Sequence, residues 1–172
     1  NGSWNAAPQT NVTFTVSKAT ASVTLNGLSQ TYDGASKTVT ATTTPAGKTV
    51  DITYDGSATA PVNAGSYTVV GTVNDTMYQG GATGTLTVAK ADQTISFTNP
   101  GSKITTDSVS LSATASSGLS PTFGVVSGSA SVVGSTATFT GAGSVTLSAN
   151  QSGNSNWNAA PQTNVTFSVT KA

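Results

Sequence analysis

The chain has 172 residues and no net charge, and its ionisable side chains are six Lys, six Asp and four Tyr. Because it has neither His nor Cys, it cannot form a thiolate nucleophile, a Ser-His dyad or an imidazole metal site. Zero net charge without a Lys cluster also argues against nucleic-acid binding, which needs a basic surface. The composition therefore predicts a protein that is not an enzyme and needs no cofactor.

Charged residues make up only 7% of the chain, against roughly 25% in an ordinary soluble domain. Apolar residues nevertheless fall at alternating positions, with Thr or Ser between them, and this pattern predicts β-strands rather than disorder. No apolar run approaches the ~18 residues that a membrane-spanning helix needs. Direct insertion into a membrane is therefore not expected.

The first alternating run contains Val12, Phe14 and Val16, within residues 1–17. Further strands are expected in the first half of the chain at Val23/Leu25, Val39/Ala41, Ile52/Tyr54, Tyr67/Val69/Val73 and Leu86/Val88. In the second half they are expected at Ile95/Phe97, Val109/Leu111/Ala113, Phe123/Val125, Ala137/Phe139, Val145/Leu147/Ala149 and Val165/Phe167/Val169. Turn signals separate these runs, among them Asp33-Gly34, Asp55-Gly56, Asn63-Ala64-Gly65 and Ser117-Gly118. Short strands joined by turns predict antiparallel β-sandwiches.

One long repeat organises the chain. The eleven residues Trp4 to Phe14 return as Trp157 to Phe167, an offset of 153 positions (157 − 4). Similar endings close three stretches at Lys18-Ala19, Lys90-Ala91 and Lys171-Ala172. We therefore expect residues 1–17 to be the final strand of a preceding B-type module, followed by a module A at 18–90 and a module B at 91–172. All four Tyr lie in module A, so the two modules should have different cores.

Both modules resemble bacterial surface repeats. Module B carries Lys90-Ala91-Asp92-Gln93-Thr94-Ile95, Gly141-Ala142-Gly143-Ser144-Val145 and Gly153-Asn154-Ser155-Asn156-Trp157, and it resembles the bacterial Ig-like repeats of large secreted proteins. Module A carries Tyr32-Asp33-Gly34, Ile52-Thr53-Tyr54 and Asn63-Ala64-Gly65-Ser66-Tyr67, and it resembles the MBG family of β-rich repeats. The resemblance implies an Ig-like fold and a spacer role in an adhesin-like protein at the bacterial cell surface or outside the cell, with no catalytic residues to carry over.

Aromatic side chains are the candidates for ligand binding, because an exposed ring can stack on a sugar. Trp4, Trp157, Tyr32 and Tyr78 are the residues considered. The alternative for both Trp residues is a hydrophobic plug at the end of a sandwich. An exposed cluster with an indole or several Tyr would favour binding, whereas buried aromatics under a Thr/Ser surface would favour a spacer.

No metal site is expected. Asp51 and Asp55 are the closest carboxylates in an extended stretch, and period-two geometry separates them by about 13 Å, too far for one Ca²⁺. Asp92 is the best placed residue for an ion between modules. The six Lys lie at junctions, before strands or in a turn. None falls at an apolar-face position inside a clearly patterned strand, which argues against a Lys-derived isopeptide cross-link.

The sequence thus predicts a structural stalk or spacer in a long repetitive fibre, with neighbouring repeats as its partners. The alternative is an adhesin module that recognises a glycan or host protein through loops at a sandwich end. Residues 1–17 expose an apolar strand without a module of their own, so we expect this segment to be mobile or to exchange as a strand with a neighbouring chain.

Overall fold

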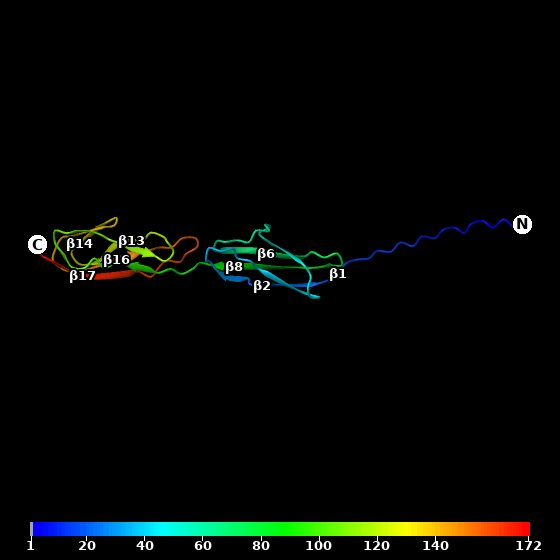
Figure 1. Ribbon diagram of the computed structural model, residues 1–172, viewed down its shortest axis with the longest axis horizontal. Coiled ribbons are helices and arrows are strands. Elements are labelled where there is room, and N and C mark those ends of the chain that lie inside the picture. The colour runs from blue at the N-terminus through cyan, green and yellow to red at the C-terminus, as the bar shows by residue number, and fades with distance from the viewer. Residues whose placement is uncertain (1) are drawn as a thin grey trace.

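The computed structural model describes residues 2–172, and every regular element in them is a β-strand. None of these residues lies in a helix that could cross a membrane. Figure 1 shows two narrow β-sandwich modules placed end to end, with the first residues extending away from module A on the side opposite module B. The predicted fold class, an all-β chain of sandwich modules, is confirmed.

Module A contains eight strands in three small sheets. A four-stranded sheet has the order β3-β8-β6-β5, a second sheet pairs β2 with β4 antiparallel, and a short parallel pair joins β1 to β7. The strands are β1 (Ala19–Thr20), β2 (Ser22–Asn26), β3 (Ser29–Thr31), β4 (Thr40–Thr44), β5 (Val50–Tyr54), β6 (Gly65–Val73), β7 (Tyr78–Gln79) and β8 (Gly81–Ala89).

The core of module A follows from the alternation in its two longest strands. Val69 on β6 and Leu86 on β8 are fully buried, while the Thr residues between apolar positions face outward. Tyr54 lies in the same cluster, and its hydroxyl accepts a hydrogen bond of 2.8 Å from the amide of Val39. A buried phenol needs such a partner, so this bond fixes the start of the β4 region against β5.

Module B contains nine strands. One sheet has the order β10-β17-β16-β13, and the opposing face is formed by β11-β15-β14 together with β12-β9. The strands are β9 (Ile95–Phe97), β10 (Lys103–Ile104), β11 (Ser108–Ser110), β12 (Ala113–Ala115), β13 (Thr122–Ser127), β14 (Ala130–Val133), β15 (Thr136–Phe139), β16 (Gly143–Asn150) and β17 (Thr163–Thr170).

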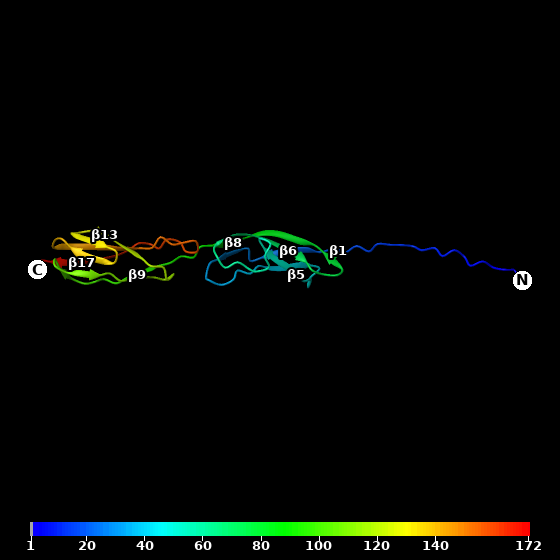
Figure 2. The same cartoon turned by 90° about the horizontal axis from the view of Figure 1, so that it is seen from above.

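The core of module B is richer in Phe than that of module A. Phe139 and Phe167 meet edge to face with ring centroids 5.7 Å apart, and Val145 and Leu147 of β16 are fully buried between the sheets. Figure 2 shows the two layers of this module from above. The Tyr residues of the first half and the Phe residues of the second half therefore belong to two different cores.

Two features differ from the expectation. The sandwiches are not purely antiparallel, because β1 with β7, β3 with β8, and β10 with β17 are parallel pairs. The predicted strand within 1–17 does not form over residues 2–17, and residue 1 lies outside the described residues. A strand needs a partner for its backbone, and this segment runs in the open with Phe14 80% exposed.

Candidate functional site

The most elaborate polar and aromatic arrangement lies where module A meets module B. Its centre is a turn of module B, residues 153–158, which we call the joint loop. The loop is shaped by Asn154, whose side-chain oxygen accepts bonds from the amides of Asn156 (2.8 Å) and Trp157 (2.9 Å). Gly153 has a positive φ of 75°, and a Cβ at this position would lie 2.3 Å from the carbonyl oxygen of Trp157. Only glycine fits there without a rearrangement.

The connection between the modules is tied to the joint loop by backbone bonds. Ala91 forms a parallel bridge with Trp157, in which the Ala91 amide donates to Asn156 O (3.0 Å) and the Asn158 amide donates to Ala91 O (2.9 Å). Lys90 Nζ donates to Asn154 O (2.7 Å), and Asn158 Nδ2 donates to Asp92 Oδ1 (2.7 Å). The connecting residues are therefore part of the structure of module B.

Two side chains of the joint loop, Asn156 and Trp157, contact module A. Asn156 accepts a bond from the Ala64 amide at its Oδ1 (2.8 Å) and donates from Nδ2 to Asn63 Oδ1 (3.0 Å). The indole of Trp157 meets the ring of Tyr32 edge to face, with centroids 5.6 Å apart and planes at 82°. These contacts join residues 92 or more positions apart in sequence and set the orientation of one module on the other.

The receiving residues of module A are themselves held in place. The hydroxyl of Tyr67 on β6 donates to the carbonyl of Asn63 (2.9 Å), which fixes the 63–64 turn. The Tyr32 amide donates to Ala89 O at the end of β8 (2.9 Å). The Tyr32 ring also packs against the core of module A. The joint loop thus docks on a surface that the fold of module A has already ordered.

The charged groups beside Tyr32 show where the sequence-based prediction was wrong. Lys37 was expected only to precede a strand, yet it is 5% exposed, and its Nζ forms an ion pair with Asp33 at 2.5 Å. The hydrogen bond from Lys37 holds the pKa of the Asp33 carboxyl below its ordinary value. An ionised carboxylate is a poor acceptor for amide formation, so this pair is a salt bridge rather than a poised cross-link.

The four aromatic candidates do not form one cluster. Trp157 and Tyr32 meet at the joint, whereas Trp4 lies in the extended first segment and is 96% exposed. Tyr78 lies on β7 at the other end of module A, where Lys48 Nζ sits 3.9 Å above the centre of its ring. Of the four, only Trp157 and Tyr32 contact each other, and their contact joins the two modules.

The carboxylates considered for metal binding accept bonds from protein N–H groups. Asp51 Oδ2 accepts from Asn74 Nδ2 (2.9 Å), and Asp55 Oδ1 accepts from the Thr68 amide (2.7 Å). Asp92 accepts from Asn158, as described above. Within residues 2–172 there is no group of three or more acidic, His or Cys residues that could hold a metal ion.

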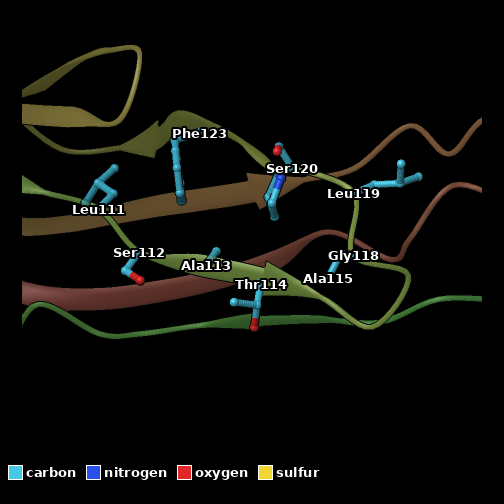
Figure 3. A pocket seen from close by; sticks show the side chains of 10 residues that line it. Leu111, Ser112, Ala113, Thr114, Ala115, Gly118, Leu119, Ser120 and Phe123 are labelled. Carbon is cyan, nitrogen blue, oxygen red and sulfur yellow. The ribbon is translucent and has the colours of Figure 1, made fainter.

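A second feature is an open groove on the side of module B, with a volume of about 450 Å³. Figure 3 shows Ala113 on β12 and Leu111 on the segment just before it, while Phe123 approaches from β13 opposite. The loop with Leu119 and Ser120 borders the same groove. Its lining mixes apolar side chains with Ser and Thr hydroxyls and carries no charge.

Asn156 and its partners Asn63 and Ala64 are not among the site residues predicted from the sequence. The density of Asn in 154–158 was a signal for a structured turn, since Asn side chains readily bond to nearby backbone amides. The contact with module A had no such signal, because it depends on the relative placement of two folded units.

Comparison with known proteins finds a family match over part of the chain. No curated protein matches the chain. Among solved structures, the first two extracellular cadherin repeats (EC1-2) of human protocadherin-24 align at 13% identity over 88% of this chain and 98% of that one, with a TM-score of 0.39. A SusE-like, surface-located polysaccharide-binding protein from the heparin utilisation locus of Bacteroides thetaiotaomicron aligns at 16% identity over 89% of this chain and 34% of that one, with a TM-score of 0.31. The MBG domain family model matches residues 21–92, which supports an MBG-type module in the first half of the chain.

Proposed function

We propose that this chain is a structural spacer segment of a long repetitive bacterial protein, located at the cell surface or secreted, and that it performs no catalysis. The observation that carries the proposal is the joint, where Asn156 and Trp157 of one module bind Asn63, Ala64 and Tyr32 of the other. Such contacts hold two modules in one orientation, which is what a spacer requires.

Other features support the same role. The alternating strands place Thr and Ser outward over most of both modules, a surface that stays soluble with few charges. The MBG match and the resemblance of module B to bacterial Ig-like repeats favour a protein built from tandem modules. On this proposal, module A occupies 18–90, module B occupies 91–172, and their partners are neighbouring repeats of the same kind.

The spacer role is tested by measuring the distribution of distances across the joint. Because the chain has no Cys, spin labels can be attached only at introduced positions. Labels at the exposed residues Thr85 of module A and Ser131 of module B, both changed to Cys, should give one narrow distance distribution by pulsed electron spin resonance. A broad distribution would show modules that move independently, and the spacer proposal would then fail.

The second candidate is a ligand-binding adhesin module, and the groove of module B is the observation that favours it. Leu119 and Phe123 border a cavity of about 450 Å³ that is also lined by Ser and Thr, a size and character suited to a small organic ligand. The fully exposed Trp4 offers a second surface for stacking. Under this alternative the ligand is a glycan or a host protein.

A glycan array probed with the whole chain separates the two candidates. Binding that is lost in Leu119→Asp and kept in the control variant Met77→Asp, which changes an exposed apolar residue of module A, would favour the adhesin module. Absence of binding, together with a narrow distance distribution, is the result expected for a spacer. Catalysis is tested by assaying the purified chain for hydrolase and transferase turnover, and reproducible turnover that a single Asp or Lys variant abolishes would contradict the proposal.

A further inference from the structure

The same amino-acid sequence occurs twice in this chain in two opposite environments. We call residues 4–17 the leading segment; its counterpart is 157–170. Val12, Phe14 and Val16 of the leading segment are 83%, 80% and 80% exposed. Their counterparts Val165, Phe167 and Val169 are 9%, 7% and 3% exposed, in the core of module B.

The second copy shows what kind of surface the leading segment fits. There, β17 pairs antiparallel with β16 from Ala149↔Thr163 to Gly143↔Val169 and parallel with β10 at Lys103↔Val169. Phe167 inserts against Phe139. The leading segment differs from β17 only at Thr15 for Ser168 and Ser17 for Thr170, and both of these positions of β17 face solvent. Every inward residue that the position of β17 requires is therefore present in the leading segment.

The leading segment cannot reach module B of its own chain. It joins module A at Lys18, where Lys18 Nζ donates to Asp75 O (2.8 Å) and Ala19 pairs with Tyr78. Figures 1 and 2 show that this attachment lies at the end of module A opposite module B. A B-type sandwich that receives the segment must therefore be one other than residues 91–172 of the same chain.

We propose that the leading segment is a donor strand that occupies the β17 position of module B in a second copy of this chain once that position is vacated. The backbone would pair with β16 and β10 of the receiving copy, and Phe14 would take the place of Phe167. In the intact chain β17 is tethered beside its own sheet and holds the position by its high effective concentration. Release of β17 is thus the condition for exchange.

Two consequences follow from the geometry. The contact joins the leading segment of one copy to module B of another, so it is a heterologous interface, and repeating it links further copies in a row. In addition, the repeat has Ser3 at the position that corresponds to Asn156. A donated segment therefore brings the indole of Trp4 to the joint but not the amide that binds Asn63 and Ala64.

The experiment weakens β17 in the 172-residue chain and leaves the leading segment intact. Phe167→Asp places a charge in the core position of β17, so the unmodified segment of a second copy should replace it. We expect the wild-type chain and the Phe14→Asp variant to be monomers by light scattering at all concentrations. The Phe167→Asp variant should form concentration-dependent oligomers, and the double variant Phe14→Asp/Phe167→Asp should be monomeric with module B unfolded.

A disulfide test fixes the register and separates donor-strand exchange from aggregation. Thr166 lies opposite Thr146 in the β16/β17 pair, and its counterpart in the leading segment is Thr13. In the Phe167→Asp background, a chain with Thr13→Cys mixed with a chain with Thr146→Cys should form an intermolecular disulfide. Thr10→Cys, three residues out of register, should not cross-link.

The inference is overturned if Phe167→Asp remains monomeric, if the double variant oligomerises to the same extent, or if Thr10→Cys cross-links as readily as Thr13→Cys. These outcomes leave the spacer proposal untouched, because that proposal rests on the joint between modules A and B of one chain. The distance distribution across the joint tests it separately.

Discussion

Removing the side-chain contacts at the joint should release one module from the other without unfolding either. We consider Asn156→Ser, Trp157→Ala and the double variant. Serine is the matched replacement for Asn156, because the repeat itself carries Ser3 at this position. Neither residue belongs to the buried core cluster of module B. The backbone bonds between Ala91 and the joint loop remain in all three variants.

The expected effect can be worked out from the contacts. Asn156 makes two hydrogen bonds to module A, each contributing about 0.5–1.5 kcal/mol net. The edge-to-face pair of Trp157 and Tyr32 adds about 0.5–1.5 kcal/mol. The sum of about 1.5–4.5 kcal/mol favours the docked orientation by a factor of about 10 to 2,000, since roughly 1.4 kcal/mol corresponds to tenfold. In the double variant docked and undocked orientations should become comparable.

The assay is the distance distribution between labels at Thr85 and Ser131. It should be narrow in the wild type, somewhat broader in each single variant and widest in the double variant, while the melting temperatures of both modules stay nearly constant. The control variant is Tyr78→Ala, which removes an aromatic side chain far from the joint. If the double variant keeps the narrow wild-type distribution, the backbone of the connecting residues sets the orientation, and our account of the side chains is wrong.

Three other predictions concern the modules themselves. Leu86 in module A and Leu147 in module B are fully buried, and changing either to Ala should lower the free energy of unfolding of its module by about 2–5 kcal/mol. Each variant should lower the temperature of one of two calorimetric transitions by roughly 8 °C or more. A shift of both transitions by one variant would show that the modules unfold together. The hydrogen bond from Lys37 lowers the pKa of Asp33, and the bond from the Met77 amide lowers the pKa of Asp75. The contribution of these two carboxylates to stability is therefore present above the ordinary carboxyl pKa and is lost as pH falls through the lowered pKa. Because the chain has no His, the melting temperature should be flat from pH 5 to 8 and fall below about pH 4. A change in melting temperature centred near pH 6.5 would contradict this prediction. Deleting residues 1–17 should leave both transitions within about 3 °C, consistent with a change under ~0.5 kcal/mol, whereas unfolding of module A would make the segment an integral part of it.

The alternation in the sequence predicted the longer strands because each has one buried face. Val69 and Leu86 in module A and Leu147 and Phe167 in module B occupy such faces. The short strands β1, β3, β7, β10 and β14 were not predicted. With two to four residues each, they show no period, and they exist because a neighbouring backbone offers bonds. The parallel direction of three pairs likewise has no signature in residues so few.

The sequence predicted where the two modules join but not the contacts between them. The Lys90-Ala91 ending marked the boundary, and a plug at a sandwich end was one of the two interpretations of Trp157. Its partner Tyr32 and the bonds of Asn156 depend on how two modules meet, which alternation within each module does not encode. Lys37 was missed for a different reason. It continues the alternation of Val39, but a charged residue was not expected on an apolar face without a visible partner.

The parallel pairs at the module ends determine how the chain responds to tension. In each module the last strand runs beside a strand near the module's start in the same direction, β8 beside β3 and β17 beside β10. When tension along the chain reaches one of these pairs, the early strand is drawn toward its N-terminal end and the last strand toward its C-terminal end. Force then acts along the strands, and the bonds of the pair bear it simultaneously rather than opening one after another. Both modules thus present their closing strands in shear, the geometry that resists stretching most strongly for a given number of hydrogen bonds.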